Sequence, residues 1–184
     1  MIHRLVQPEI LDSLPQDHPD ALKNRRDIAL LNSLMRNYRW LTHALSREIL
    51  PDERLLELAA GTGDLARCVW ATVPKINPSR YTALDLWQKP LNWPADARWE
   101  TADLLEYDGY AEHPVITGNL ILHQFDDATL SEKIAPRLQS ARLLIFNEPV
   151  RRKRHIWQLR AAFALGLNHV SRHDGRVSIQ GGFV

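Results

Sequence analysis

The spacing of apolar residues changes near residue 50, and the change predicts two kinds of structure. From Asp20 to about residue 49, apolar side chains recur at steps of three and four, which places them on one face of a helix. This face comprises Leu31, Leu34, Met35, Tyr38, Leu41 and Leu45. One long helix or two shorter ones are therefore expected, ended by Pro51. Residues 1–19 carry three prolines and are expected to form an irregular arm.

Beyond residue 53 the apolar residues form short continuous runs, which are typical of strands buried in a parallel sheet. The runs cover residues 55–58, 81–85, 114–119 and 141–148, and residues 98–104 are read as a further short strand followed by an acid. Helical spacing separates several of them, and a last helix is expected from Ile156 to Leu167. Strands that alternate with helices predict an α/β fold: a Rossmann-like, mostly parallel sheet of order 3-2-1-4-5, with helices on both faces.

The same change of pattern predicts the domain organisation. Residues 1–52 would form an N-terminal arm and helical cap, and residues 53–184 a single compact Rossmann-like domain. A chain of 184 residues, of which 45% are apolar, is long enough for one substantial core.

Charge and cysteine content indicate which binding partners and which cellular compartment to expect. The net charge of +1 gives no global reason to expect nucleic acid or an anionic membrane as a partner. The one cysteine, Cys68, has no internal partner, which fits a reducing compartment. No apolar run approaches the roughly 20 residues that span a bilayer, and no apolar leader is visible. A soluble, cytoplasmic protein is expected.

The first strand is followed by two glycines one residue apart, Gly61 and Gly63, and then by a helical pattern. Glycines at a strand-to-helix turn let a ligand approach the backbone, and the free N–H groups of the helix start point at it. Glu57, four residues before Gly61, would repel a phosphate and favour a ligand that carries an amine. A simple turn between strand and helix remains the alternative.

The stretch from Glu57 to Gly63 resembles the nucleotide-binding loop of class I S-adenosylmethionine (SAM) dependent methyltransferases. That loop reads acid-x-Gly-x-Gly-x-Gly, and Ala59 stands here for the first glycine. The resemblance implies SAM as cofactor, with Glu57, Ala59, Gly61, Thr62 and Gly63 around it.

The end of the second strand carries the next candidate. Asp85 lies 22 residues after Gly63, a spacing that places a carboxylate beside the ribose of a ligand held by the glycine loop. The matching position in the family is also acidic, and the resemblance adds the next residue, Leu86, to the cofactor site. A surface aspartate at a strand end is the alternative.

Asp103 and Leu104 follow the third expected strand. At the matching place in the family, a carboxylate accepts a hydrogen bond from the exocyclic amine of adenine, and the next residue gives a backbone N–H to the ring. The resemblance therefore implies that Asp103 and Leu104 bind adenine. An aspartate that begins a turn is the alternative.

The stretch from Asn119 to Phe125 follows the fourth strand and resembles the family's Asn-x-x-x-His-His-Phe, with Gln124 for the second histidine. The resemblance places it beside the sulfonium and the methyl acceptor, and assigns Asn119 to the cofactor site. His123 is the candidate general base, since the histidine pKa lies near neutrality; a pocket-shaping histidine is the alternative. No second His or Cys stands at ligand spacing, so no metal is expected.

These residues together predict methyl transfer from SAM to a small organic acceptor, phenolic or quinone-like by resemblance alone. An NAD(P)-binding oxidoreductase and a catalytically silent SAM-binding module stay open as alternatives. The basic cluster at residues 151–154 is read as a solvated face, or as a contact for an acidic substrate or carrier protein.

The C-terminal region predicts how the sheet edge is covered. Asp174-Gly175 carries a turn signal, and complete members of the resembled family have two further strands. The edge at residues 141–147 would then be covered by a short strand at residues 177–179, or by a second copy of the chain in a homodimer. We favour the dimer, because three or four residues cover such an edge poorly.

Overall fold

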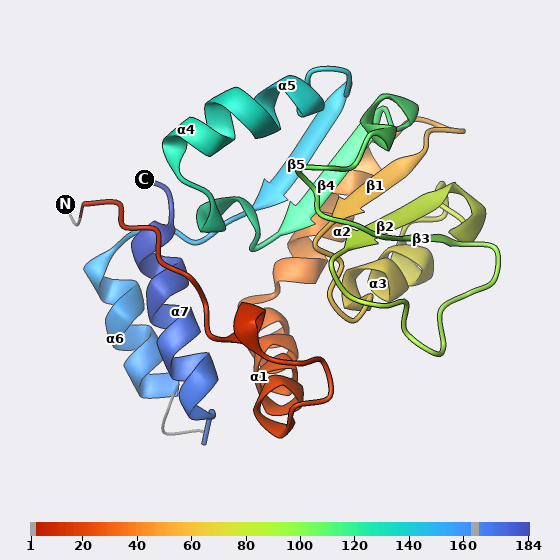
Figure 1. The fold of residues 1–184 in the computed structure, drawn as a ribbon. Helices are drawn as coiled ribbons and strands as arrows, with labels where there is room; N and C mark the ends of the chain where they lie inside the picture. The colour runs from red at the N-terminus through yellow and green to blue at the C-terminus, as the bar shows by residue number, and fades with distance from the viewer. Residues whose placement is uncertain (1–2, 163–165) are drawn as a thin grey trace. The chain divides into compact units, whose positions relative to one another are not determined.

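The computed structural model describes residues 3–162 and 166–184, which group into two compact units (Figure 1). The sheet unit comprises Arg36–Ile121 and Asp127–Asn147, and the helical unit comprises Met1–Met35, Leu122–Asp126 and Glu148–Val184. The chain therefore crosses between the units several times. This grouping cuts the chain elsewhere than between residues 52 and 53, where the sequence places the domain boundary, and that boundary stays a prediction.

The elements follow the expected alternation of strands and helices. In the sheet unit they are α2 (Asn37–Glu48), β1 (Leu55–Leu58), α3 (Asp64–Thr72), η2 (Pro78–Arg80), β2 (Tyr81–Asp85), β3 (Arg98–Thr101), η3 (Gly109–Glu112), β4 (Val115–Asn119), α4 (Asp127–Thr129), η5 (Leu130–Ile134), α5 (Ala135–Leu138) and β5 (Leu143–Asn147). In the helical unit they are η1 (Leu11–Ser13), α1 (Pro19–Met35), η4 (Leu122–Gln124), α6 (Lys153–Ala162) and α7 (His169–Gly181).

The five strands form one parallel sheet in the order β3-β2-β1-β4-β5, which confirms the predicted Rossmann-like fold class. Leu58 at the end of β1 is level with Leu84 of β2 and with Gly118 of β4. The strand order reverses direction between β1 and β4. The carboxyl ends of the strands beside this switch point are where open α/β sheets bind ligands.

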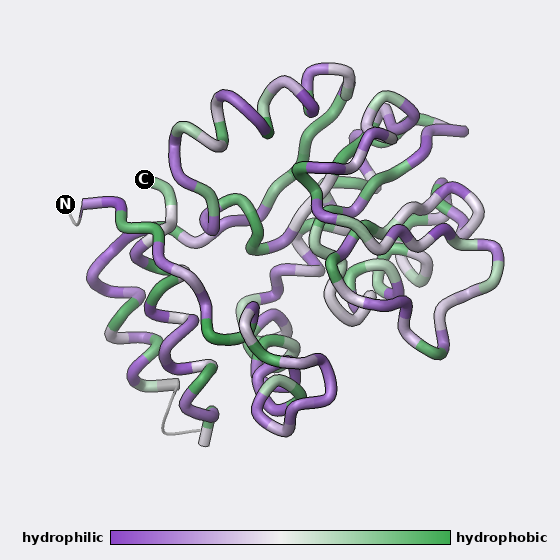
Figure 2. Tube along the Cα trace, in the orientation of Figure 1, coloured by the Kyte–Doolittle hydropathy of each residue, from purple (hydrophilic) through white to green (hydrophobic). Residues whose placement is uncertain are grey.

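The core of the sheet unit lies between the sheet and the helices α2 and α3. All four residues of β1 are buried, and the central strands are mostly hydrophobic along their length (Figure 2). Leu41 and Leu45 of α2 pack with Leu65 and Val69 of α3 in one apolar cluster. Trp93 adds edge-to-face contacts with Tyr81 and Trp99 to this cluster. This packing holds β1, and with it the start of the glycine loop, in place.

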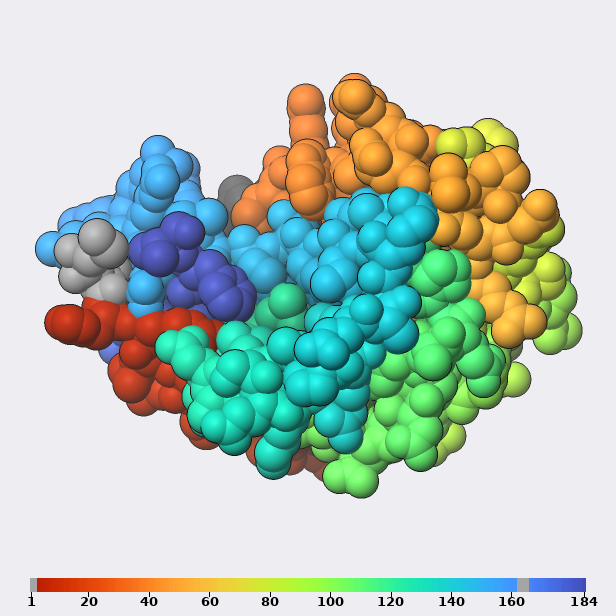
Figure 3. Space-filling model, turned by 90° about the horizontal axis from the view of Figure 1, so that it is seen from above, coloured from red at the N-terminus to blue at the C-terminus, as the bar shows by residue number. Residues whose placement is uncertain are grey.

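The segment α4–η5–α5 lies on the opposite side of the strands from α2 and α3 (Figure 1). It runs beside the segment around η3 (Figure 3), where the Arg137 guanidinium donates to the carbonyl oxygen of Leu105. Ile134 and Leu138 are the buried residues of this segment. Both faces of the sheet therefore carry helices, as the sequence predicts.

The fifth strand differs from the prediction. Its composition predicts burial, but Ile145 is its only fully buried residue and Leu144 is 45% exposed. The reason is its place at the edge of the sheet, with β4 as its one neighbour. The proposed strand at residues 177–179 is wrong, because these residues lie inside α7. Pairing of β5 with a second copy of the chain stays a prediction.

The helical unit consists of α1, α6, α7 and the N-terminal arm. Arg36, with a left-handed φ of 58°, ends the first of the two helices expected between residues 20 and 49. Asp174-Gly175 forms no turn but lies in the middle of α7. This helix begins at His169, and the side chain of the preceding residue, Asn168, caps it by accepting from the Ser171 amide. The part of the expected last helix at residues 163–165 lies outside the described residues. None of the described helices combines the length and apolar character needed to cross a membrane.

Candidate functional site

The loop between β1 and α3 is built from left-handed backbone positions. Ala59, Gly61 and Gly63 have φ angles of 55°, 59° and 74°. Ala60 donates its amide to the Leu84 carbonyl of β2 at 3.2 Å, which ties the loop to the neighbouring strand. The left-handed angle at Ala59 costs roughly 1 kcal/mol, because this residue carries a side chain that glycine lacks.

The two glycines of the loop serve different purposes. A Cβ atom added to Gly61 would meet no other atom within 4 Å, so this residue borders open space. A Cβ added to Gly63 would lie 2.5 Å from Cζ3 of Trp93, so this residue is required for close packing. Gly61 therefore leaves room for a ligand against the backbone, and Gly63 fixes the loop to the aromatic cluster.

Thr62 lies between the glycines, and its hydrogen bonds go to residues at the start of α3. Its hydroxyl donates to Asp64 Oδ2 at 2.6 Å, and the Arg67 guanidinium donates to the Thr62 carbonyl at 2.8 Å and to Asp64 Oδ1 at 2.7 Å. These contacts hold the loop in shape at the N-terminus of α3. What the loop offers a ligand here is main chain rather than the threonine side chain.

Asp85 joins the end of β2 to the glycine loop. Its Oδ2 accepts from the Gly61 amide at 2.6 Å and its Oδ1 accepts from the Trp87 amide at 2.9 Å. A carboxylate oxygen can accept more than one hydrogen bond, so these contacts orient the group without exhausting it. Leu86, the next residue, is 66% exposed. The predicted proximity of Asp85 to the loop is present in the structure.

Glu57 is placed differently from the expectation. It is the third residue of β1, 3% exposed, and its Oε2 accepts from the Tyr81 hydroxyl at 2.6 Å. Burial raises the pKa of Glu57 from 4.5 to about 8, and the hydrogen bond from Tyr81 offsets only part of that rise. Glu57 is therefore mostly neutral at pH 7 in this state and presents no carboxylate charge to an amine.

Asp103 and Leu104 begin the segment after β3. A backbone hydrogen bond joins the carboxyl end of β3 to the carboxyl end of β2. The Ala102 amide donates to the Asp85 carbonyl at 3.0 Å. Asp103 is exposed, and its Oδ1 accepts from the Leu105 amide at 2.8 Å. Leu104 is buried, and its carbonyl accepts from the Tyr110 hydroxyl at 2.7 Å. The structure thus brings Asp85 and Asp103 to the same edge of the sheet.

Asn119 ends β4 and is joined to the end of β5. Its Oδ1 accepts from Asn147 Nδ2 at 2.9 Å, and the Leu120 amide donates to the Asn147 carbonyl, also at 2.9 Å. Leu120 takes a left-handed φ of 61° directly after the strand. Asn147 is a site-edge residue that the sequence analysis does not identify. Its signal is a polar residue at the end of an apolar strand.

His123 belongs to the helical unit, in η4, and both of its ring nitrogens face carboxylates. Nδ1 lies 2.9 Å from Glu148 Oε2, and Nε2 lies 3.4 Å from Glu9 Oε1. Burial alone lowers the pKa of His123, but the bonds to Glu148 and Glu9 outweigh it and raise the pKa to about 9. At neutral pH the ring is therefore a charged imidazolium, without the free lone pair that a base needs.

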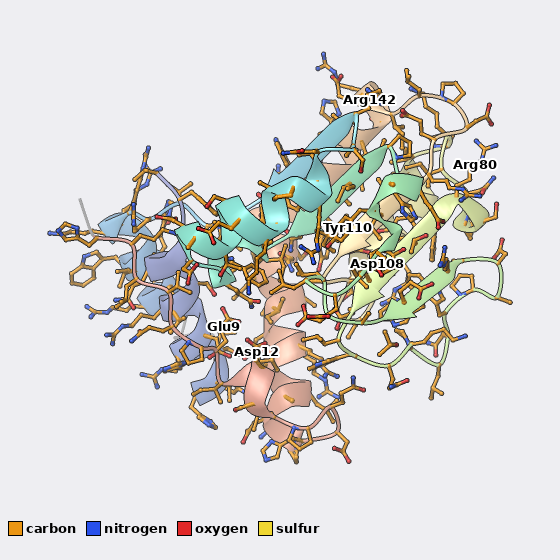
Figure 4. The ribbon with its side chains drawn as sticks, turned by 45° about the horizontal axis from the view of Figure 1, so that its top comes forward. Glu9, Asp12, Arg80, Asp108, Tyr110 and Arg142 are labelled. Carbon is orange, nitrogen blue, oxygen red and sulfur yellow. The ribbon has the colours of Figure 1, made fainter. Side chains whose placement is uncertain are left out.

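Glu9, Glu148 and Ser178 complete this cluster and are absent from the sequence prediction. Glu9 lies on the N-terminal arm beside α7 (Figure 4), and Ser178 donates to its Oε1 at 2.6 Å. Glu148 also accepts from the backbone amides of Leu122 and His123 at 2.8 and 3.2 Å. Glu148 has a sequence signal, as an acid that ends a strand, whereas Glu9 lies in an arm without periodicity.

No protein-family model matches this sequence, and neither does any curated protein sequence. Among solved structures, the plantazolicin methyltransferase BpumL in complex with SAH matches with a TM-score of 0.60 at 13% identity, over 93% of this chain and 66% of BpumL. BpumL with a triazolic desmethylPZN analog and SAH gives 0.62 at 11% identity, over 95% and 67%. The chain thus spans about two thirds of the length of these structures, and the likeness establishes the fold.

Proposed function

We propose that the sheet unit binds S-adenosylmethionine and that the protein transfers its methyl group to a small organic acceptor. The observation that carries the proposal is the glycine loop held by Asp85 beside the switch point of the sheet. The open space at Gly61 fits a ligand that lies against the main chain, and the donors and acceptors around it suit a nucleoside. The shared fold with SAH-bound methyltransferases supports this choice of ligand.

The resemblance and the geometry together assign roles to the chain's residues. The main chain from Ala59 to Gly63 would lie along the amino-acid part of the cofactor, and Asp85 would accept from the ribose hydroxyls. Asp103 would accept from the adenine amine, and Leu104 would donate its backbone N–H to the ring. SAM supplies an already activated methyl group, so the protein has mainly to align the acceptor.

His123 as general base stays a prediction that this geometry disfavours. A ring clamped between Glu9 and Glu148 must lose its proton and one of its contacts before it can accept a proton from an acceptor. We therefore propose that His123 acts as a positioning residue, which ties the N-terminal arm to η4. Loss of turnover by about a hundredfold or more in a His123→Gln variant that is still folded would instead support the base.

Cofactor binding can be tested by calorimetric titration of the full chain with SAM, SAH and NAD. We expect SAM and SAH to bind and NAD not to bind. Asp85→Ala should weaken SAH binding by about 1–3 kcal/mol, because ribose hydroxyls lose a charged partner. Asp96→Ala is the matched control, since Asp96 is exposed in the loop before β3. Equal affinity in both variants would overturn the assignment of the site.

The reaction can be tested by transfer of a labelled methyl group to a panel of acceptors. The panel contains phenols, hydroquinones and a triazolic compound like the desmethylPZN analog bound to the solved neighbour. Transfer to any of these would support an enzyme. SAM binding without transfer to any acceptor class would instead favour a catalytically silent SAM-binding module.

A further inference from the structure

A cavity of about 600 Å³ lies within the helical unit, between α6, α7 and the N-terminal arm. None of the residues proposed to bind SAM lines it. The volume falls in the range of small-molecule sites, about 300–1,000 Å³. The lining residues used below are Ile156, Leu159, Arg160, Arg172, Arg176, Val177 and Gln180.

One part of the cavity wall is apolar. Ile156 and Leu159 contribute to it from α6, and Val177 contributes from α7. The two helices approach closely at this wall because Gly175 has no side chain: a Cβ there would lie 3.1 Å from both methyl carbons of Leu159. This wall can therefore cover an alkyl or aryl group of a ligand.

The other part of the wall is cationic. Arg172, Arg176 and Gln180 are spaced four residues apart on α7, which puts them on one face of the helix. Arg160 faces the cavity from α6, and its guanidinium lies 5.0 Å from the centre of the Trp157 ring. Figure 2 shows the resulting alternation of hydrophilic and hydrophobic segments along both helices.

Two of the three arginines in this wall, Arg160 and Arg176, have no carboxylate partner in the described part of the chain. Residues 150–184 hold seven Lys or Arg residues and one acid, Asp174. The carboxylate of Asp174 accepts from the amides of Ile10 and Leu11 on the arm and contacts the His173 ring. Two guanidinium groups therefore border the cavity without a counter-charge.

A buried acceptor without a partner gives a second, independent sign of a ligand. The side-chain oxygen of Gln180 is inaccessible to solvent and has no hydrogen-bond partner in the described part of the chain. Buried polar atoms are nearly always satisfied, so an orphan beside a cavity points to a missing donor. If the Gln180 amide turns toward the cavity, a hydroxyl or N–H group on a ligand can supply it.

We propose that this cavity binds a small amphipathic anion, with a carboxylate or phosphate head group on an apolar chain or ring. Guanidinium groups bind both kinds of head group through paired, charge-assisted hydrogen bonds. The apolar wall would cover the body of the ligand, and Gln180 would accept from a donor next to the head group. This inference does not depend on the proposed methyl transfer, because none of its residues belongs to the SAM site.

Octyl phosphate is a suitable probe for calorimetric titration of the full chain. We expect octyl phosphate to bind at micromolar to submillimolar concentration. Inorganic phosphate should bind at least tenfold more weakly, because it has no alkyl chain to displace water from the apolar wall. Octylamine has the same chain with the opposite charge and should not bind. Equal binding of octylamine, or no binding of octyl phosphate at millimolar concentration, would overturn the proposal.

Matched variants separate the cavity from the general basic surface. Arg176→Gln and Arg160→Gln should each weaken octyl phosphate binding about tenfold, the loss of one charge-assisted contact. Arg152→Gln removes the same charge from the exposed basic cluster outside the cavity, and should change binding less than twofold. If Arg152→Gln weakens binding as much as Arg176→Gln, the site is merely a basic surface. Unchanged melting temperatures show that the variants fold.

The same head group could come from a free metabolite or from a membrane lipid. Sedimentation with phosphatidylglycerol vesicles distinguishes these sources, with phosphatidylcholine vesicles as the neutral control. We expect octyl phosphate to bind and both kinds of vesicle to leave the protein in solution. Vesicle binding that is as strong in Arg176→Gln as in the unaltered chain would show a lipid contact outside the cavity. If Arg176→Gln also leaves octyl phosphate binding unchanged, the proposal is contradicted.

Discussion

Two ionisable side chains, one in each unit, are buried to the same extent, but at pH 7 one is neutral and the other is charged. Glu57 in the sheet unit and His123 in the helical unit are both 3% exposed. Glu57 has a single neutral hydrogen-bond donor, the Tyr81 hydroxyl, and burial raises its pKa to about 8. His123 lies between the carboxylates of Glu9 and Glu148, which overcome burial and raise its pKa to about 9.

The comparison teaches that burial alone does not decide the charge of these groups. Desolvation disfavours the charged form in both, so the difference comes from the partners. Glu57 forms no ion pair, and the charge of Arg67 lowers its pKa too little to offset burial, so Glu57 stays neutral at pH 7 and can ionise when a cation comes closer. His123 already holds its counter-charges and is fixed as an imidazolium. The environment of Glu57 therefore suits a group that responds to a ligand. The environment of His123 suits a group that holds the N-terminal arm and η4 together.

The largest effect is expected from removal of a partner of His123. Glu148→Ala leaves a buried imidazolium with one carboxylate and deprives the amides of Leu122 and His123 of their acceptor. We expect a loss of about 3–5 kcal/mol in the free energy of unfolding, measured by urea denaturation, because broken buried ion pairs are costly. The exposed Glu132→Ala is the control and should change stability by less than about 0.5 kcal/mol. A loss in Glu148→Ala as small as the control's would mean that the imidazolium is absent.

The dependence of stability on pH is expected to be the next largest effect. Both folded pKa values lie above the ordinary ones, 4.5 for Glu57 and 6.5 for His123. The folded protein therefore holds more protons than the unfolded chain in these windows, and stability must fall as pH rises. Between pH 6.5 and 9 we expect a loss of roughly 3–5 kcal/mol, measured by denaturation at each pH.

Single variants separate the two contributions because the windows differ at their ends. Glu57 contributes from pH 4.5 to 8, and His123 contributes from pH 6.5 to 9. Glu57→Gln should flatten the slope between pH 5 and 6.5, and His123→Gln should flatten it between pH 8 and 9. A slope above pH 8 that survives in His123→Gln would show that another group titrates there.

The comparison also explains which features the sequence can predict. Strands 81–85 and 115–119 are predictable because continuous apolar runs must be buried, and the contact between Asp85 and the glycine loop follows from parallel strands ending at one edge. The charge states of Glu57 and His123 are not predictable, because they depend on partners from distant segments. Glu9 lies 114 residues before His123 and gives no local signal.

The last helix shows a second reason for failure. Asp174-Gly175 is a turn signal by local propensity, yet it lies within α7. Two tertiary contacts override the propensity: the Asp174 side chain accepts from the amides of the arm, and Gly175 makes room for Leu159. Local preferences amount to about 1 kcal/mol per residue, and contacts of this kind are large enough to outweigh them.

The two glycines of the loop give a smaller effect that tests the open side of the site. Gly63→Ala adds backbone strain and a clash with Trp93, so we expect a loss of roughly 2–3 kcal/mol in unfolding free energy. Gly61→Ala adds only the strain, about 1 kcal/mol, but fills the proposed ligand space. Calorimetry should find SAH binding lost in Gly61→Ala at a temperature where the variant is folded. Full binding in that variant would place the ligand elsewhere.

The smallest expected effect is a proton released when SAM binds. Glu57, with a pKa of about 8, is mostly protonated at pH 7. A ligand that brings a sulfonium and an ammonium near β1 would favour the carboxylate, lower this pKa and expel the proton. Affinity for SAM should therefore rise less than tenfold from pH 7 to 8 and level off above pH 9.

Titrations at pH 7 in phosphate and in Tris, whose ionisation enthalpies differ, measure the protons released. We expect up to about one proton per SAM bound in the unaltered chain and none in Glu57→Gln. Equal release in both proteins would assign the proton to another group, and no release in either would mean that Glu57 stays neutral beside the bound cofactor.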